Sequence, residues 1–460
     1  MVIQKEVWKE EQKKHYSRRL SIKEGMTWSI RKSFGDSYVS PFAVAIGSAD
    51  WIVAIINSLW NLSFSGQLIG AKLLKKFHRK KVLTRAVTVD ALSWLFLFMI
   101  GIFYLTDTFS PFLPYLIILA LSSVVIAGGI GHPAWFSIMG DIVDEKYRGR
   151  WYAKRETLIA FSTIILGISS SFLLQYLKEI NYEFVGFTLF FLIAFIGRIS
   201  CVSMLNKHYA PQRKQNKEID YSFKNFFKEA KKTNFGKFCL FRAMFAFAVT
   251  ISSSLIAVYL LRHVGLSYPT YILATFSGTF FSIITLNLWG KISDKYGNYV
   301  TIAITTTFIP LTPLLWIASQ NPVYLMIIPG LIGGTAWSAF IVASSNFIYD
   351  NIPKGKRGKS ISYYNSLVGI GALLGGLVSA TLIKTINTSW IAPIYLIFII
   401  GASLRMITVF YWMIKIKEVT KKRKLKNIRE LKDLVIKEVR PTLVEDIHEI
   451  ASIKKYINTK

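Results

Sequence analysis

The chain has 460 residues, of which 56 are Lys or Arg and 26 are Asp or Glu, so its formal charge at pH 7 is +30. Apolar residues make up 52% of the chain and aromatic residues 15%, which excludes an intrinsically disordered protein and a small disulfide-stapled domain. The positive charge then indicates either a nucleic-acid-binding surface or the loops of a membrane protein.

Long apolar runs follow one another along the whole chain. Each run has about 20 mostly apolar residues, enough for a helix to cross about 30 Å of hydrocarbon. The first six lie near residues 27–47, 50–71, 83–105, 112–138, 155–177 and 184–206. The second six lie near residues 238–261, 268–290, 299–318, 322–348, 361–383 and 389–414. The sequence therefore predicts an all-α, polytopic membrane protein with twelve transmembrane helices.

The basic residues alternate between the two sides of these predicted helices. If the N-terminus is cytoplasmic, 48 of the 56 Lys and Arg residues fall in the cytoplasmic tails and loops, and the outward loops hold only Lys178, Arg262 and Lys384. The positive-inside rule therefore predicts that both termini are cytoplasmic. The charge then reflects topology and contact with anionic lipid headgroups, and no nucleic-acid partner is expected. Because the first residues are charged, no cleavable signal peptide is expected either.

One loop pattern occurs twice, with an offset of 209 residues. Asp141 stands seven residues before Arg148-Gly149 after the fourth run, and Asp350 stands seven residues before Arg357-Gly358 after the tenth. This repeat predicts two pseudo-symmetric six-helix halves. The predicted parts are a cytoplasmic N-terminal tail, the N-terminal half, a cytoplasmic linker, the C-terminal half and a basic cytoplasmic tail, at residues 1–26, 27–206, 207–237, 238–414 and 415–460. In the last of these, apolar residues at helical spacing over 425–439 and 443–457 predict amphipathic segments.

The turn after the eighth run, Gly290-Lys-Ile-Ser-Asp294-Lys-Tyr-Gly297, carries the best motif. Together with the two six-helix halves it resembles the major facilitator superfamily of transporters, whose G-x-x-x-D-x-x-G turn joins the second and third helices of a half. The corresponding turn of the first half, residues 70–80, keeps its glycine and basic residues but lacks the acid. The resemblance covers nearly the whole chain and implies a cytoplasmic gate formed by Gly290, Asp294, Gly297, Asp141, Arg148, Asp350 and Arg357.

Candidates for a substrate site come from polar and aromatic residues inside the runs. An ionised side chain at a helix centre costs about 2.5–3.5 kcal/mol on insertion scales, so Asp36 in the first run is interpreted as an acid that binds substrate or a proton. The alternative is a structural ion pair with Arg31, Lys32 or Arg198. The other central-cavity candidates are His132, Trp135, Thr250 and Trp337, for which packing and local hydrogen bonding are the alternatives.

Several kinds of chemistry have no signature in the sequence. The histidines and cysteines show no metal-ligand spacing, and no phosphate-binding loop or catalytic triad is present, so neither an enzyme nor a cofactor is expected. The sequence predicts a monomeric permease of the cell membrane, which moves a small-molecule substrate by alternating access. Proton coupling, transport direction and substrate stay open. The alternatives are a non-transporting membrane sensor or scaffold on the same fold, and an exporter of lipids or other amphiphiles.

Overall fold

The computed structural model of the chain describes residues 2–211, 223–352 and 357–419. Throughout these residues the backbone forms helices joined by turns, without a strand, which confirms the predicted all-α class. Up to residue 206 the helices are α1 (Val2–Arg31), η1 (Lys32–Asp36), α2 (Val39–Ala45), α3 (Asp50–Leu59), η2 (Trp60–Leu62), α4 (Ser63–Leu73), α5 (Arg79–Leu105), η3 (Ser110–Phe112), α6 (Leu113–Ile142), η4 (Glu145–Tyr147), α7 (Arg148–Glu179) and α8 (Glu183–Asn206). From there on they are α9 (Phe223–Ala230), α10 (Asn234–Ser253), α11 (Ile256–Val258), η5 (Tyr259–His263), α12 (Tyr268–Tyr296), α13 (Asn298–Phe308), η6 (Ile309–Leu311), α14 (Thr312–Ile317), α15 (Pro322–Asn351), α16 (Arg357–Thr385) and α17 (Pro393–Met413).

Eleven helical segments within the described residues are long and apolar enough to cross a membrane, from Asp50–Leu73 to Pro393–Met413. They coincide with the second to twelfth predicted runs, and the chain is a multi-pass membrane protein. The first predicted run, 27–47, is divided between the end of α1, the π-helix η1 and α2. It is more polar than the others, yet α1 and η1 pack against α7 and α8. With this broken helix, the eleven segments account for the twelve predicted spans.

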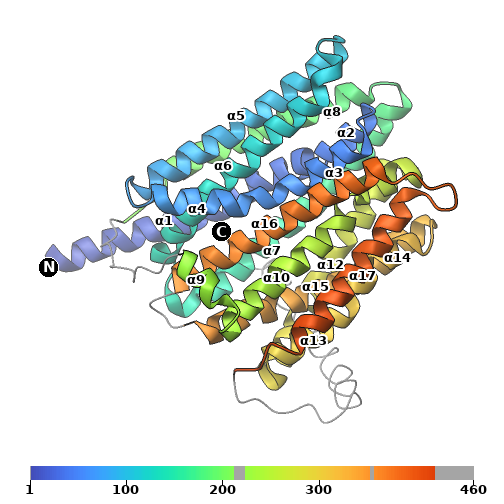
Figure 1. Cartoon of the computed structure of the whole chain (residues 1–460). Helices are drawn as coiled ribbons and strands as arrows, with labels where there is room; N and C mark the ends of the chain where they lie inside the picture. Colours follow the sequence, from blue (N-terminus) through green and yellow to red (C-terminus); the bar gives the residue numbers. More distant parts are fainter. Residues whose placement is uncertain (1, 212–222, 353–356, 420–460) are drawn as a thin grey trace. The chain divides into compact units, whose positions relative to one another are not determined.

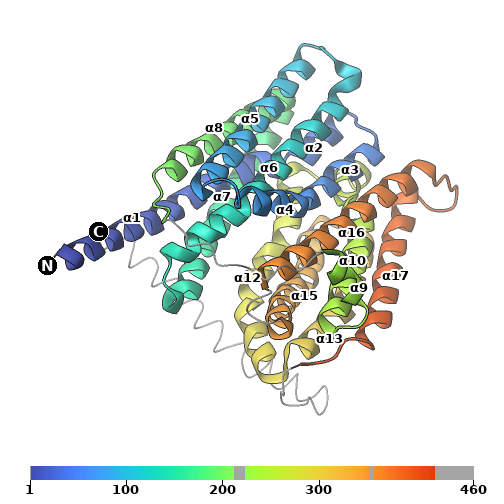
Figure 2. The ribbon, with the colours of Figure 1, turned by 60° about the vertical axis from the view of Figure 1, so that its left-hand side comes forward.

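The chain folds into two compact units, which are described here separately. Unit 1 comprises Met1–Glu218, Ala246–Ile272 and Ser362–Ile397, and unit 2 comprises Ile219–Phe245, Leu273–Ile361 and Phe398–Lys460. In unit 1, α5 packs against α6 and α8, and α4 packs against α6 (Figure 1). In unit 2, α13 packs against α15 (Figure 2).

Glycines allow a close contact between α4 and α6 in unit 1. A Cβ atom added to Gly66 of α4 would lie 2.6 Å from the Ile126 carbonyl oxygen of α6, and one added to Gly129 would overlap the Ser63 carbonyl oxygen of α4. Gly128, one residue earlier, has no atom of another element within 4 Å of such a Cβ. Small residues let transmembrane helices approach backbone to backbone, and here they fix the wall that α4 and α6 share.

The predicted linker, 207–237, contains a short helix that the sequence analysis did not predict. This helix is α9, and its residues Phe226 and Ala230 are buried. Residues four positions apart lie on one face of a helix, so α9 is anchored by one face. The rest of the linker from 212 to 222, and the amphipathic segments predicted over 425–439 and 443–457, lie outside the described residues.

Candidate functional site

A cavity of about 600 Å³ lies inside unit 1. Residues of α1, η1, η2, α4, α5, α6, α7 and α8 line it. Its polar lining includes Glu24, Arg31, Asp36, Gln67, His132, Arg155, Glu156 and Arg198. Its aromatic lining consists of Trp28, Trp60, Phe64, Trp135 and Phe136. A largely apolar cavity with a few convergent polar groups is the usual form of a small-molecule site.

Asp90 of α5 anchors the charged residues behind this cavity. Its Oδ2 accepts hydrogen bonds from Nε of Arg198 at 2.6 Å and from Nη1 of Arg31 at 3.4 Å. Its Oδ1 accepts a third from the indole Nε1 of Trp94 at 3.2 Å. Asp90 has no exposed surface, and both arginines are buried. A carboxylate between two buried guanidinium groups offsets part of their charge, so the role of Asp90 is structural.

A second buried acid extends this network. Oε2 of Glu24 lies 3.0 Å from Nη2 of Arg155, and its Oε1 lies 3.9 Å from Nη1 of Arg198. Glu24 lies in the segment predicted as the N-terminal tail, and Arg155 lies at the first position of the predicted run 155–177. Because α1 begins well before its apolar run, Glu24 is helical and its side chain reaches Arg155 of α7.

Asp36 is the most exposed of the acids Glu24, Asp36 and Asp90. Its Oδ1 accepts a hydrogen bond from Nη2 of Arg31 at 2.8 Å. Its side chain is 19% exposed, against 0% for Asp90 and 7% for Glu24. Asp36 ends η1, and π-helical turns occur frequently at functional sites. The ion pair with Arg31, an alternative to the functional interpretation, is therefore present, and Asp36 also lines the cavity.

The charged groups of this network are paired with one another. Glu24, Asp36 and Asp90 pair with Arg31, Arg155 and Arg198, and the exposed Glu156 adds a fourth carboxylate, whose Oε1 lies 2.7 Å from Nη1 of Arg155. Pairing lowers the cost of burying charge inside a membrane protein. Neutralisation of Glu24, Asp36 or Asp90 removes a partner of a buried guanidinium group.

On α6, His132, Trp135 and Phe136 form one part of the cavity wall. The His132 ring lies against Phe136, with ring centroids 4.6 Å apart, and the Arg155 guanidinium lies 4.5 Å from the centre of the Trp135 ring. The buried Nε1 of Trp135 has no hydrogen-bond partner among the described residues. A buried donor normally has a partner, so this indole is available to a solute.

The two other cavity candidates from the sequence do not line this cavity. Thr250 of α10 donates its hydroxyl to the Ala246 carbonyl at 2.9 Å within its own helix. Trp337 of α15 packs in unit 2, with ring centroids 5.6 Å from Phe340 and 6.1 Å from Phe245. A role for either residue in a solute site stays a prediction of the sequence.

The predicted gate residue Asp141 has a partner that the sequence did not reveal. Arg79, the first residue of α5, places Nη1 2.6 Å from Oδ2 of Asp141 and donates to the Ser137 carbonyl at 2.9 Å. Its Nη2 also donates to the carbonyl of Pro211, beyond α8. The turn before α5 lacks an acid, and an arginine at the helix start provides the charge pair.

Unit 2 contains a similar contact at the start of α13. Nδ2 of Asn298, its first residue, donates to Oδ2 of Asp350 at 2.7 Å. Asp350 is the next-to-last residue of α15, as Asp141 is of α6. Gly297 precedes α13 with φ 101°, a conformation that glycine adopts readily, which explains the second glycine of the motif.

The remaining gate candidates are Arg148, Gly290, Asp294 and Arg357. Arg148 donates from Nη2 to the carbonyls of Gly140 at 2.8 Å and Val143 at 3.3 Å, and so closes the end of α6. Gly290 and Asp294 lie in the last two turns of α12. Arg357 begins α16, and its side chain lies outside the described part of the chain.

At the end of unit 1 opposite to Asp141, the side chain of Arg262 in η5 contacts residues at and before the start of α3. Its guanidinium forms an ion pair with Asp50 and donates from Nη2 to the carbonyls of Ser48 at 2.9 Å and Val44 at 3.2 Å. The sequence analysis placed Arg262 in an outward loop and assigned it no role. The contact holds the ends of these elements together.

His208, just after α8, should make the stability of the fold depend on pH. Burial lowers its pKa from 6.5 to about 4, and Lys80 and Arg155 contribute to the shift. Between these two values the unfolded chain binds a proton that the folded chain does not, so the free energy of unfolding falls as the pH drops from 6.5 to about 4. Below that range this contribution is lost.

We expect His208→Asn to remove that part of the pH dependence. The measurement is the thermal unfolding midpoint of the detergent-solubilised protein, taken at intervals between pH 7.5 and pH 4, with both proteins in the same buffers. The difference between wild type and variant should change mainly below pH 6.5. A difference that is constant with pH would show that His208 does not titrate as described.

Comparisons with known proteins agree with this architecture. The family model of the Major Facilitator Superfamily matches residues 25–306 and 238–447. No curated protein matches the chain. A crystal structure of a variant of the nucleoside transporter NupG is similar with a TM-score of 0.65 and 16% identity, over 87% of this chain and 100% of that one.

Two further solved structures are similar to a comparable extent. The POT family transporter PepTSo has a TM-score of 0.64 and 11% identity, over 86% of this chain and 97% of that one. A bacterial homologue of the iron transporter ferroportin, in its inward-facing state, has a TM-score of 0.63 and 14% identity, over 86% and 98%. The membrane-spanning helices and the charged cavity are those of a secondary transporter. The chain belongs to the Major Facilitator Superfamily.

Proposed function

We propose that this transporter moves a small polar solute through the cavity of unit 1 and that Asp36 binds either the solute or a proton. The observation that carries the proposal is the position of Asp36. Among Glu24, Asp36 and Asp90, the acids within the helix bundle, Asp36 has the largest exposed fraction and makes a single ion pair. It is therefore the acid that can exchange its partner without breaking the buried network behind it.

The exchange would proceed through Arg31. A cationic or hydrogen-bond-donating group of the solute, or a proton, competes with Nη2 of Arg31 for Asp36, now 2.8 Å away. Nη1 of the same guanidinium already lies 3.4 Å from Asp90, so Arg31 keeps one carboxylate when it releases the other. The tryptophans Trp28, Trp60 and Trp135 provide flat apolar walls, which suits an organic solute.

Alternating access would use contacts at the two ends of the helices. In the proposed topology both termini are cytoplasmic, in the cell membrane, and the chain divides into six-helix halves at the boundaries predicted above. Asp141 with Arg79 and Asp350 with Asn298 then lie at the cytoplasmic end, together with the motif Gly290, Asp294 and Gly297. The Arg262–Asp50 pair lies at the outward end. The protein acts as a monomer and catalyses no covalent reaction.

The test is solute uptake by proteoliposomes that contain the purified full chain. A panel of labelled sugars, amino acids, organic acids, nucleosides and organic cations identifies the solute, and Asp36→Asn is then compared with wild type. A lost hydrogen bond to a charged group costs about 1.5–3 kcal/mol, so we expect uptake at low solute concentration to fall at least about tenfold.

Asp107→Asn is the matched control, because Asp107 is an exposed acid in the turn after α5. It should transport at the wild-type rate. Equal transport by wild type and Asp36→Asn would reject the assigned role of Asp36. Failure of the folded wild-type protein to exceed empty liposomes with every solute of the panel would contradict the proposed substrate class.

A further inference from the structure

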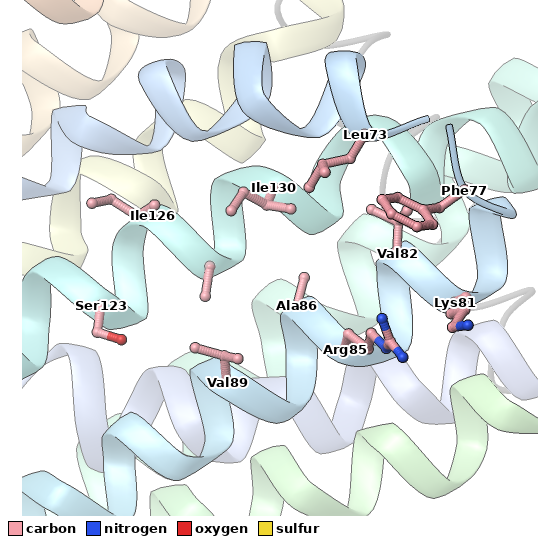
Figure 3. Close-up of a pocket in the computed structure, with 11 residues that line it drawn as sticks. Leu73, Phe77, Lys81, Val82, Arg85, Ala86, Val89, Ser123, Ile126 and Ile130 are labelled. Carbon is pink, nitrogen blue, oxygen red and sulfur yellow. The ribbon is translucent and has the colours of Figure 1, made fainter. Parts of the chain in front are cut away.

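A groove of about 420 Å³ lies on unit 1 between α4, α5 and α6. It shares no residue with the charged cavity, because the two use different faces of α5. Figure 3 shows Lys81 and Arg85 toward one end of the groove, Ser123 at the other, and apolar side chains such as Val89 and Ile130 between them.

The two basic residues of the groove are positioned to act together. Lys81 and Arg85 are exposed and lie four residues apart on α5, so their side chains project from the same face of the helix. Neither side chain has an ion-pair partner in the part of the chain that the structure describes, and the groove lining contains no acid. Arg79, two residues before Lys81, is by contrast paired with Asp141. One end of the groove therefore carries two positive charges, those of Lys81 and Arg85, and no acid of the lining offsets them.

The rest of the groove is apolar and open. Phe77 is 47% exposed and Val89 is 48% exposed. The other apolar residues of the lining are Leu73, Val82, Ala86, Ile126, Ala127 and Ile130. The hydroxyl of Ser123 accepts a hydrogen bond from Ser93 at 2.8 Å, so the polar group at the far end is already paired. From Lys81 to Val89 the helix rises about 12 Å, which gives the groove the length of an extended aliphatic chain segment.

We propose that the groove binds one anionic phospholipid of the cytoplasmic leaflet. Its phosphodiester lies between Lys81 and Arg85, and one acyl chain runs along Ala86, Val89 and Ile130 toward Ser123. The positive charge and the anionic lipid of that leaflet are complementary, and the groove supplies the apolar surface that a soluble anion would not need. The choice of leaflet rests on the topology in the proposed function, whereas the binding itself does not.

The test is native mass spectrometry of the detergent-solubilised full chain titrated with palmitoyl-oleoyl phosphatidylglycerol. Lys81→Gln/Arg85→Gln should weaken the tightest lipid-binding step about 30-fold, which corresponds to about 1 kcal/mol for each basic residue at about 1.4 kcal/mol per tenfold. Lys75→Gln/Lys76→Gln removes the same charge just outside the groove lining and should leave that step unchanged. An equal loss in both double variants would overturn the site, because it would show binding to general surface charge.

A second variant tests the apolar part and does not depend on charge. Val89→Trp fills the open groove from an exposed position and should also weaken phosphatidylglycerol binding, with the helix packing intact. Phosphatidylcholine with the same chains should bind at least tenfold more weakly than phosphatidylglycerol. Equal binding of the two lipids, unchanged binding by Val89→Trp, or displacement of the lipid by inorganic phosphate would each overturn the proposal. These measurements need no transported solute, so a failure here is distinguishable from a failure of the proposed function.

Discussion

Asp90→Asn should lower the free energy of unfolding by about 3–5 kcal/mol, because it removes the shared carboxylate between two buried guanidinium groups. Arg198 Nε at 2.6 Å and Arg31 Nη1 at 3.4 Å would face a neutral amide of nearly the same shape. The loss would thus come from charge and not from a cavity. The measurement is equilibrium unfolding in mixed micelles with increasing denaturing detergent.

The control variants test whether the destabilisation is specific to Asp90 or follows the removal of any carboxylate in the network. Asp36→Asn should lower the free energy of unfolding by clearly less than Asp90→Asn does, because Asp36 is 19% exposed and contacts one guanidinium group. Asp90→Asn combined with Arg198→Gln should cost less than the sum of the two single variants, because the double change restores the charge balance. An Asp90→Asn protein that unfolds within about 1 kcal/mol of wild type would contradict the assigned network.

Gly129→Ala should destabilise the helix pair that forms one wall of the cavity. Its new Cβ would overlap the Ser63 carbonyl oxygen and lie 3.0 Å from Cα of Gly66. These are backbone atoms, so relief requires α4 and α6 to move apart. Overpacking of a tight contact costs about 1–3 kcal/mol, and we expect solute uptake to fall as well, because the displaced helices carry Gln67 and His132 of the cavity wall.

Gly128→Ala provides a control one residue away. A Cβ at Gly128 meets no atom of another element within 4 Å, and alanine favours a helix over glycine by about 1 kcal/mol. The unfolding midpoint of Gly128→Ala should therefore equal or exceed that of wild type. If the two alanine variants unfold alike, the close contact between α4 and α6 does not limit stability.

The spans were predictable because a bilayer imposes one demand on every segment that crosses it. Each backbone group has to be satisfied within its own helix over about 20 apolar residues, so hydropathy alone located the eleven long apolar segments found in the described residues. The first run, 27–47, departs from this pattern because polar residues around Asp36 accompany a π-helix and a helix break. The resemblance to the family rested on the motif at Gly290–Gly297 together with the two predicted six-helix halves, and both can be recognised in one sequence.

The charged network was only partly predictable, because its contacts join residues far apart in the chain. Asp90 and Arg198 are separated by 108 positions, and a single sequence contains no signal that pairs them. Glu24 and Arg155 were overlooked for a different reason. Glu24 stands where α1 continues past its apolar run, and Arg155 stands at the first position of its run. Hydropathy does not distinguish such positions from a solvated loop. Arg79 was counted among the loop bases for the same reason.

The contacts of the glycines in α6 were also only partly predictable from the sequence. Gly128, Gly129 and Gly131 are close neighbours in one helix, and the sequence suggests close packing for all of them alike. The structure shows that Gly129 meets α4, that Gly131 makes ordinary contacts from 3.5 Å onward, and that Gly128 faces open space. The direction in which each residue points depends on where α4 crosses α6, which only the fold determines.

The decisive measurement is solute uptake by proteoliposomes of wild type and Asp36→Asn that carry a pH-sensitive dye in the lumen. We predict that the wild-type protein accumulates one solute of the panel and that Asp36→Asn loses at least about nine-tenths of the initial rate. A lumenal pH change that accompanies wild-type uptake would show that transport is coupled to protons, and uptake without a pH change would favour Asp36 as a solute ligand. Wild-type uptake that Asp36→Asn retains in full would contradict a solute path through this cavity.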